Sequence, residues 1–181
     1  MHELQGVMPI LPTIFKATGA IDETGTRRVL DYVIDAGASA VVFPGLASEY
    51  DTLTMEERVH MTARIGAWTA GRVPFVVGAS APTTAEAMNY AQAGAQAGAV
   101  AAMILTPKAY ADDLTAMARF FSEVHESSGL DVMLQNAPAP MGIGMPLPKV
   151  AELARSVKGI RYVKEEAAPS GQRITQLGEL A

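Results

Sequence analysis

A short apolar run ends in a lysine and two carboxylates at Gly159-Ile160-Arg161-Tyr162-Val163-Lys164-Glu165-Glu166. We predict that this run is a buried strand with Lys164 at its C-terminal end. In parallel α/β proteins, the groups that do chemistry gather at that end of the strands. A lysine in partly apolar surroundings can act there as an amine nucleophile on a carbonyl. The alternative is a strand that runs out into solvent with a charged tail.

The composition bounds what the chain can be. It has 181 residues, 49% of them hydrophobic, with no cysteine and a formal net charge of −5. This length predicts one domain over residues 1–181, and the lack of cysteine excludes disulfides and thiolate metal sites. The mildly acidic balance predicts neither a nucleic acid nor a membrane as a partner. No signal peptide or membrane-length apolar run is visible, so we expect a cytoplasmic protein.

Apolar runs alternate with amphipathic stretches about six times along the chain. Strands are predicted at residues 7–15, 40–43, 73–78, 100–105, 131–134 and 159–164. Helices are predicted after each of these runs, and capping boxes at Thr54 with Glu57 and at Thr83 with Glu86 open two of them. This alternation predicts an α/β fold, either an open doubly wound sheet or a barrel. A full barrel needs about eight such units, and the chain supplies about six.

Polar residues follow the predicted strands and should converge at one edge of the sheet. They are Thr13, Gly45-Leu46-Ala47-Ser48-Glu49, Ser80, Thr106 to Tyr110, Gln135-Asn136 and Lys164-Glu165-Glu166. This set is rich in hydroxyls and amides and suits a small oxygenated substrate such as a keto acid or a sugar acid. The loop at residues 45–48 leads toward a helix, and its N–H groups could hold a carboxylate, although a simple tight turn is the alternative.

Other chemistries lack support in the sequence. His2, His60 and His125 are isolated and are expected on the surface or in packing, and no metal-ligand spacing is present. The glycines of residues 94–98 precede a strand instead of following one, so they are no dinucleotide fingerprint. We therefore predict no metal and no dinucleotide cofactor.

Five motifs together resemble one known family. They are Pro12-Thr13-Ile14-Phe15, Gly45-Leu46-Ala47-Ser48-Glu49, Gly71-Arg72-Val73-Pro74, Gln135-Asn136-Ala137-Pro138 and Tyr162-Val163-Lys164-Glu165. Their order and spacing are similar to those of the dihydrodipicolinate synthase / N-acetylneuraminate lyase superfamily. The resemblance covers essentially the whole chain and implies a (β/α)₈ TIM barrel, of which about six of eight units are present. It also implies that Lys164 forms a Schiff base with a 2-oxo acid.

Two departures from the synthase and lyase branches bear on the substrate. Those branches usually have Gly-Thr-Thr-Gly-Glu where this chain has Gly45-Leu46-Ala47-Ser48-Glu49, and Tyr-Asn-x-Pro where it has Gln135-Asn136-Ala137-Pro138. The pattern is more similar to the L-2-keto-3-deoxyarabonate dehydratase branch, which handles a sugar acid. The resemblance therefore implies a dehydration of a 2-keto-3-deoxy sugar acid. A Schiff-base aldolase, a synthase-like enzyme that uses pyruvate, and an inactive truncated barrel or binding module stay open.

The resemblance gives each candidate residue a role. Lys164 attacks the 2-keto carbon, and a nearby carboxylate removes the C3 proton. Glu166 is preferred over Glu165 for this step, because residues two apart on a strand share a face. Ala47 and Ser48 hold the substrate carboxylate. Gln135 and Asn136 bind hydroxyls or orient the catalytic groups, and Thr13 is a further substrate-binding candidate. Lysine itself supplies the carbonyl chemistry, so no cofactor is expected; full-length members are often tetramers, and the assembly of this chain stays open.

Overall fold

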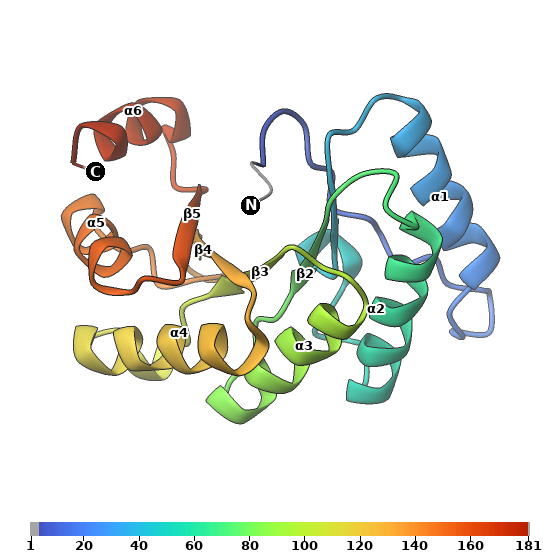
Figure 1. The fold of residues 1–181 in the computed structure, drawn as a ribbon, viewed down its shortest axis with the longest axis horizontal. Coiled ribbons are helices and arrows are strands. Elements are labelled where there is room, and N and C mark those ends of the chain that lie inside the picture. Colours follow the sequence, from blue (N-terminus) through green and yellow to red (C-terminus); the bar gives the residue numbers. More distant parts are fainter. Residues whose placement is uncertain (1–3, 181) are drawn as a thin grey trace. The chain divides into compact units, whose positions relative to one another are not determined.

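The computed structural model describes residues 4–180, which alternate helices with strands (Figure 1). His2 lies outside the described residues. In chain order the elements are α1 (Glu23–Asp35), β1 (Val41–Phe43), η1 (Leu46–Ser48), α2 (Met55–Thr69), β2 (Phe75–Gly78), α3 (Thr84–Gln96), β3 (Ala101–Leu105), η2 (Lys108–Tyr110), α4 (Leu114–Ser128), β4 (Asp131–Asn136), α5 (Leu147–Ser156), β5 (Ile160–Glu165) and α6 (Ser170–Leu180). The predicted α/β alternation is confirmed.

Contacts within the chain divide it into two compact units. One unit runs up to Gly78 and includes Gln92–Ala101, and the other comprises Ala79–Ala91 and the chain from Ala102 onward. The prediction of a single domain over residues 1–181 stays a prediction.

In the first unit, β1 pairs in parallel with β2, and α1 and α2 pack together. Val41, Val42 and Phe43 are buried, as expected for a strand covered on both faces. The prediction of a full strand over residues 7–15 is wrong, because only an isolated parallel bridge joins Ile10 to Val42. Proline, which lacks an N–H, stands at positions 9 and 12 and interrupts the ladder there. The chain still runs beside β1, since Leu11 N donates to the Val42 carbonyl at 2.9 Å.

In the second unit, the strand order β3-β4-β5 follows the sequence, and β4 and β5 are parallel. All five residues of β3 are buried, and so are Val132 to Asn136 of β4. Helices α4 and α5 pack against this sheet with Met117, Phe121, Val124, Val150 and Leu153 buried. Helix α6 differs, because none of its residues is buried.

The helix starts follow the sequence closely. Thr54 and Glu57 form the predicted capping box, with each side chain bonded to the other residue's N–H. At the second box, the Thr83 hydroxyl accepts from Glu86 N and donates to the Glu86 carboxylate. The predicted surface and packing roles of two histidines are confirmed. His60 is exposed beside Glu23, whose pKa its hydrogen bond helps to lower, and His125 contacts the Leu130 carbonyl.

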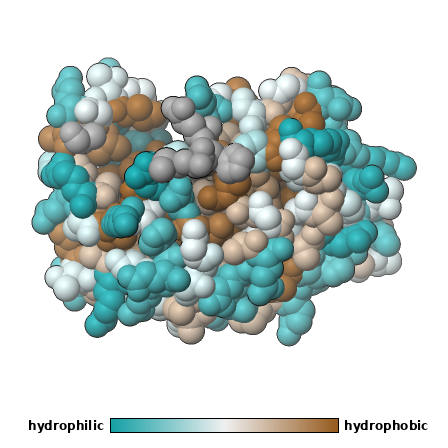
Figure 2. All heavy atoms as spheres, viewed as in Figure 1, coloured by the Kyte–Doolittle hydropathy of each residue, from teal (hydrophilic) through white to brown (hydrophobic). Residues whose placement is uncertain are grey.

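No described helix combines the length and the apolar character that a bilayer crossing requires. Figure 2 shows hydrophilic residues interspersed with hydrophobic ones over the face that it draws. Large hydrophobic side chains that are exposed include Val7, Tyr32, Met141 and Ile174.

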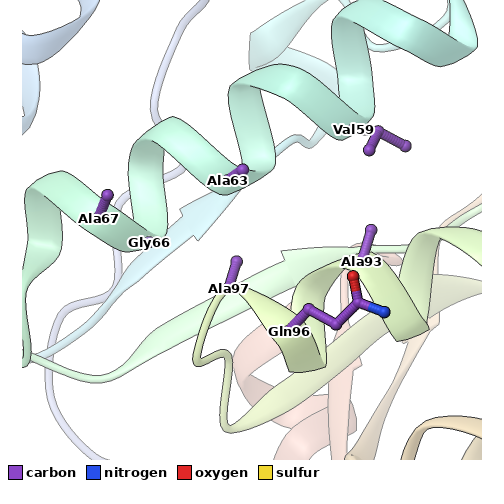
Figure 3. A pocket seen from close by; sticks show the side chains of 7 residues that line it. All are labelled: Val59, Ala63, Gly66, Ala67, Ala93, Gln96 and Ala97. Atoms are coloured by element: carbon purple, nitrogen blue, oxygen red, sulfur yellow. The ribbon is translucent and has the colours of Figure 1, made fainter.

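Small residues allow α2 to approach the end of α3 within the first unit. A hollow of about 310 Å³ there is lined by Val59, Ala63, Gly66 and Ala67 from α2 and by Ala93, Gln96 and Ala97 (Figure 3). Gly66 sets the distance, since a Cβ added to it would lie 2.1 Å from the Ala97 carbonyl oxygen and 2.9 Å from its Cβ. Backbone cannot yield as a flexible side chain does, so this contact requires glycine.

We expect Gly66→Ala to destabilise the fold by about 1–3 kcal/mol, because overpacking forces backbone shifts. Urea unfolding followed by circular dichroism measures the change. The matched control is Gly178→Ala in α6, where a Cβ would meet nothing within 4 Å. In this control the free energy of unfolding should rise by up to about 1 kcal/mol, because alanine has a higher helix propensity than glycine. Equal effects of the two substitutions would contradict the close approach at Gly66.

Candidate active site

The pairing of β4 with β5 assembles the candidate site in the second unit. Its register places Gln135 opposite Lys164 and Asn136 opposite Glu165. The ladder continues one residue beyond β5, because Glu166 N donates to the Asn136 carbonyl at 3.0 Å. The predicted placement of Lys164 at the C-terminal end of a strand is thus observed.

Lys164, Glu166 and Gln135 meet on one side of this strand pair. The Lys164 ammonium contacts Glu166 Oε1, and Gln135 Nε2 donates to both carboxylate oxygens of Glu166 at 3.2 Å. The side chains of Lys164 and Glu166 keep 30% and 23% of their exposure, so solutes can reach them. Gln135 is buried. An amine, a carboxylate and an amide therefore stand together, with the carboxylate placed to take a proton from the amine.

Asn136 and Glu165 lie on the opposite side and are occupied by protein contacts. Asn136 Nδ2 donates to Glu165 Oε2 at 2.7 Å and to the Met145 carbonyl at 3.1 Å, and Met145 N donates to Asn136 Oδ1 at 2.9 Å. The sequence predicts Asn136 as a substrate-binding or orienting residue. The contacts of its amide in this structure fit the orienting role.

The first unit holds the other predicted residues, Thr13, Ala47 and Ser48. The Thr13 hydroxyl donates to the Ser48 carbonyl at 2.7 Å, which fixes η1 against the chain beside β1. The Ser48 hydroxyl donates to the Leu11 carbonyl at 2.5 Å and accepts from Gly45 N at 2.9 Å. Ser48 is fully buried, whereas Ala47 is exposed. The loop is thus a tight turn braced by hydroxyls, and Ala47 is its accessible part.

Beyond η1, α2 begins at Met55, directly after the predicted cap residue Thr54. Tyr50 in this connection lies under the Arg58 guanidinium, 5.1 Å from its ring centroid. Burial raises the pKa of the Tyr50 phenol above its usual range, and the neighbouring Asp51 carboxylate adds to this shift.

Hydroxyls also lie in the second unit at Ser80, Thr106 and Tyr110. Ser80 Oγ accepts from Leu105 N at 2.9 Å. Thr106 is buried with its hydroxyl unpartnered among the described residues. The Tyr110 hydroxyl lies 3.4 Å from that of Thr84. Among residues 4–180, no group of three or more His, Asp or Glu side chains is arranged to hold a metal ion.

The sequence missed one contributor, Arg173. Its Nε donates to Glu165 Oε1 at 3.0 Å, and its guanidinium also reaches the Met145 carbonyl at 3.2 Å. Eight positions and a turn separate Arg173 from Glu165, so no strand or helix periodicity could link them. One signal could have indicated such a partner. Glu165 ends a strand that the sequence predicts to be buried, and charged groups are rarely buried unless they are paired.

Parallel strands that alternate with helices define an α/β protein, and a lysine in contact with a carboxylate lies at the C-terminal end of one strand. The "Dihydrodipicolinate synthetase family" matches residues 3–179. The chain therefore belongs to the dihydrodipicolinate synthetase family.

Relatives within the family carry more than one name. The chain is 30% identical over 176 residues to the "L-2-keto-3-deoxyarabonate dehydratase" of Azospirillum brasilense, covering 96% of this chain and 57% of the relative. It is 31% identical to the "4-hydroxy-tetrahydrodipicolinate synthase" of Sodalis glossinidius, covering 97% of this chain and 59% of the relative.

A solved structure shares the fold. YagE of Escherichia coli K12, a protein of this family solved in complex with pyruvate, superposes with a TM-score of 0.87 at 29% identity. The match covers 95% of this chain and 58% of YagE. The barrel class expected from the sequence is thus confirmed, and the chain spans somewhat under three fifths of the relatives it matches here.

We expect Asn136→Ala to lower the free energy of unfolding by about 2–4 kcal/mol. The substitution removes a partner from Met145 N and from the Glu165 carboxylate, and each buried polar group left without a partner costs about 1–3 kcal/mol. Chemical denaturation measures the loss.

Asn89→Ala, at an exposed site of α3, is the matched control and should change stability by less than about 1 kcal/mol. A cost for Asn136→Ala as small as that of the control would show that its hydrogen bonds contribute little.

Proposed function

We propose that the chain acts as a Schiff-base lyase on a 2-keto acid, through an imine on Lys164. The observation that carries the proposal is the contact between the Lys164 ammonium and the Glu166 carboxylate at the C-terminal end of β5. A nucleophilic amine must lose a proton before it attacks, and a carboxylate in contact with it can accept that proton. The family membership and the pyruvate in the YagE complex support the choice of a 2-keto acid.

The steps follow from the side chains that meet there. Lys164 Nζ attacks the 2-keto carbon, and the carbinolamine loses water to give a protonated imine. The imine draws electrons from the neighbouring C–H bond, and Glu166 takes the C3 proton to leave an enamine. The enamine expels the C4 hydroxyl as water once that hydroxyl is protonated, and hydrolysis of the imine releases the product. Positioned acid–base groups contribute about 10²–10⁴-fold each.

We propose a 2-keto-3-deoxy sugar acid such as L-2-keto-3-deoxyarabonate as the substrate, with dehydration as the reaction. The name of the Azospirillum brasilense relative supports this choice. So does Gln135, whose amide is directed at Glu166 and can also bind a substrate hydroxyl.

The remaining roles in the proposal follow the contacts of each residue. Ala47, an exposed residue of the loop, would hold the substrate carboxylate. Ser48 and Thr13 would support that loop, because their hydroxyls are bonded to backbone carbonyls. Lysine provides the electron sink as an imine, so the proposal includes no cofactor.

The first test is covalent trapping. The chain is incubated with pyruvate, reduced with borohydride and mapped by mass spectrometry. We expect one reduced adduct, on Lys164, because this lysine has a carboxylate beside it to take up its proton. Lys164→Gln should abolish the adduct, whereas Lys149→Gln should retain it, since Lys149 Nζ is bonded to the Ala111 carbonyl.

An adduct spread over several lysines, or none on folded chain, would overturn the Schiff-base proposal. The second of these results would favour a binding module that has lost the chemistry.

Glu166→Gln separates imine formation from proton transfer. Glutamine keeps the size of the side chain but cannot take the C3 proton, so turnover should fall by about 10²-fold or more. Trapping on Lys164 should persist, although more slowly. The measurements are product formation from a 2-keto-3-deoxy acid and the yield of reduced adduct. Loss of both in equal proportion would assign Glu166 a structural role.

An aldolase is the second candidate, and the pyruvate bound to YagE favours it. It uses the same imine but breaks the C3–C4 bond. Chromatography of the products separates the two reactions, because free pyruvate appears only after carbon–carbon cleavage.

A further inference from the structure

Glu165 is a charged residue that the proposed chemistry does not use, and its side chain is completely buried. It stands between Lys164 and Glu166 in sequence, and successive side chains of a strand point to opposite sides. Its carboxylate therefore turns away from the amine. Burying a carboxylate is costly unless it is paired and hydrogen-bonded, so the fold must supply partners for it.

Three donors serve this carboxylate. Arg173 Nε and Ala167 N each donate to Oε1 at 3.0 Å, and Asn136 Nδ2 donates to Oε2 at 2.7 Å. These donors come from α6, from the turn after β5 and from β4. Hydrogen bonds to an ionised carboxylate are about twice as strong as neutral ones, so these three donors fix the Glu165 side chain firmly.

Two of the partners also hold the Met145 backbone, in the loop between β4 and α5. Arg173 and Asn136 both donate to its carbonyl, and its N–H donates to Asn136. We call Glu165, Asn136, Arg173 and the Met145 backbone the Glu165 cluster. It ties two strand ends, a loop and a helix into one polar unit.

Helix α6 contacts this cluster through Arg173 and also packs beside α5. None of its residues is buried, and Arg173 in its first turn is bonded to β5 and to the loop. At its other end, the Leu180 carbonyl accepts from Arg155 of α5. The Arg173–Glu165 ion pair therefore links α6 to the lysine strand.

We propose that the Glu165 cluster positions Lys164 and Glu166 for catalysis, with Arg173 as a positioning residue that acts through Glu165. This inference rests on the proposed function, since it concerns the same amine. A fixed Glu165 side chain holds the backbone of residues 164–166 in one orientation about the strand axis. Lys164 and Glu166 then keep their side chains on the side of the strand pair that carries Gln135. A displacement of about 1 Å at a reacting group can cost about 10²-fold in rate.

The experiment compares Arg173→Gln with Arg173→Lys and with the control Arg155→Gln, in the full chain and at a temperature where thermal unfolding shows each to be folded. Arg155 is exposed and contacts the opposite end of α6. The measurements are the rate of borohydride-trapped imine at Lys164 with pyruvate across pH, and kcat and KM on a 2-keto-3-deoxy acid.

We expect Arg173→Gln to slow imine formation and kcat by about 10²-fold, to shift the pH profile and to leave KM nearly unchanged. Arg173→Lys should recover part of the rate, because it restores a cation beside Glu165. Arg155→Gln should behave as the parent chain does. A folded Arg173→Gln with the parent's rate would overturn the positioning role and leave the proposed function standing.

A readout independent of activity separates the two proposals. Acetic anhydride labels exposed amines, and mass spectrometry gives the rate at Lys164 relative to that at exposed Lys158. In Arg173→Gln this ratio should rise several-fold, because Lys164 loses its fixed contact with Glu166. An unchanged labelling ratio in folded Arg173→Gln overturns the positioning role, whether or not the parent chain forms an imine. A parent chain that forms no imine counts only against the proposed function.

If Arg173→Gln does not fold, the double variant Glu165→Gln/Arg173→Gln takes its place. It removes both charges together, so no buried carboxylate is left without a cation. The same rise in the labelling ratio is expected, and the same unchanged ratio would overturn the inference.

Discussion

The parallel pairing of β4 with β5 is the constraint on which the candidate active site depends. It sets Gln135 opposite Lys164 and Asn136 opposite Glu165. Because side chains alternate along a strand, a slip of one residue would turn Lys164 toward the interior and Glu165 toward the substrate side. Register therefore decides which of two adjacent glutamates can do chemistry.

At the C-terminal end of the pair, Glu166 N bonds to the Asn136 carbonyl and continues the register of the site. At the other end the register shifts by one residue between Val132 and Met133, and Val132 N bonds to the Gly159 carbonyl. Gly159 leaves room for the His125 ring, since a Cβ there would lie 2.3 Å from a ring carbon. The two glutamates then meet different surroundings. Glu165 is buried against Arg173, and Glu166 stays partly accessible beside Lys164.

Local signals in the sequence predicted much of this arrangement. Buried strands such as 101–105, the capping residues Thr54 and Thr83, and the lysine at a strand end are all set by neighbours in sequence, so pattern alone could find them. The first strand failed because its prolines leave too few N–H groups for a ladder. The role of Arg173 depends on where α6 packs. Helical periodicity predicts which face of a helix is apolar, but it does not predict a contact made by one long polar side chain.

Gln135 also constrains how protons can move in the proposed reaction. The synthase and lyase branches, from which the sequence departs here, usually have tyrosine at this position, and a phenol can pass a proton on. A glutamine amide donates and accepts hydrogen bonds but does not ionise near neutral pH, so it cannot serve as a relay. Its contact with both oxygens of Glu166 instead orients the carboxylate. In the proposed reaction Glu166, protonated after it takes the C3 proton, would then protonate the departing C4 hydroxyl, and one side chain would serve both halves of the elimination.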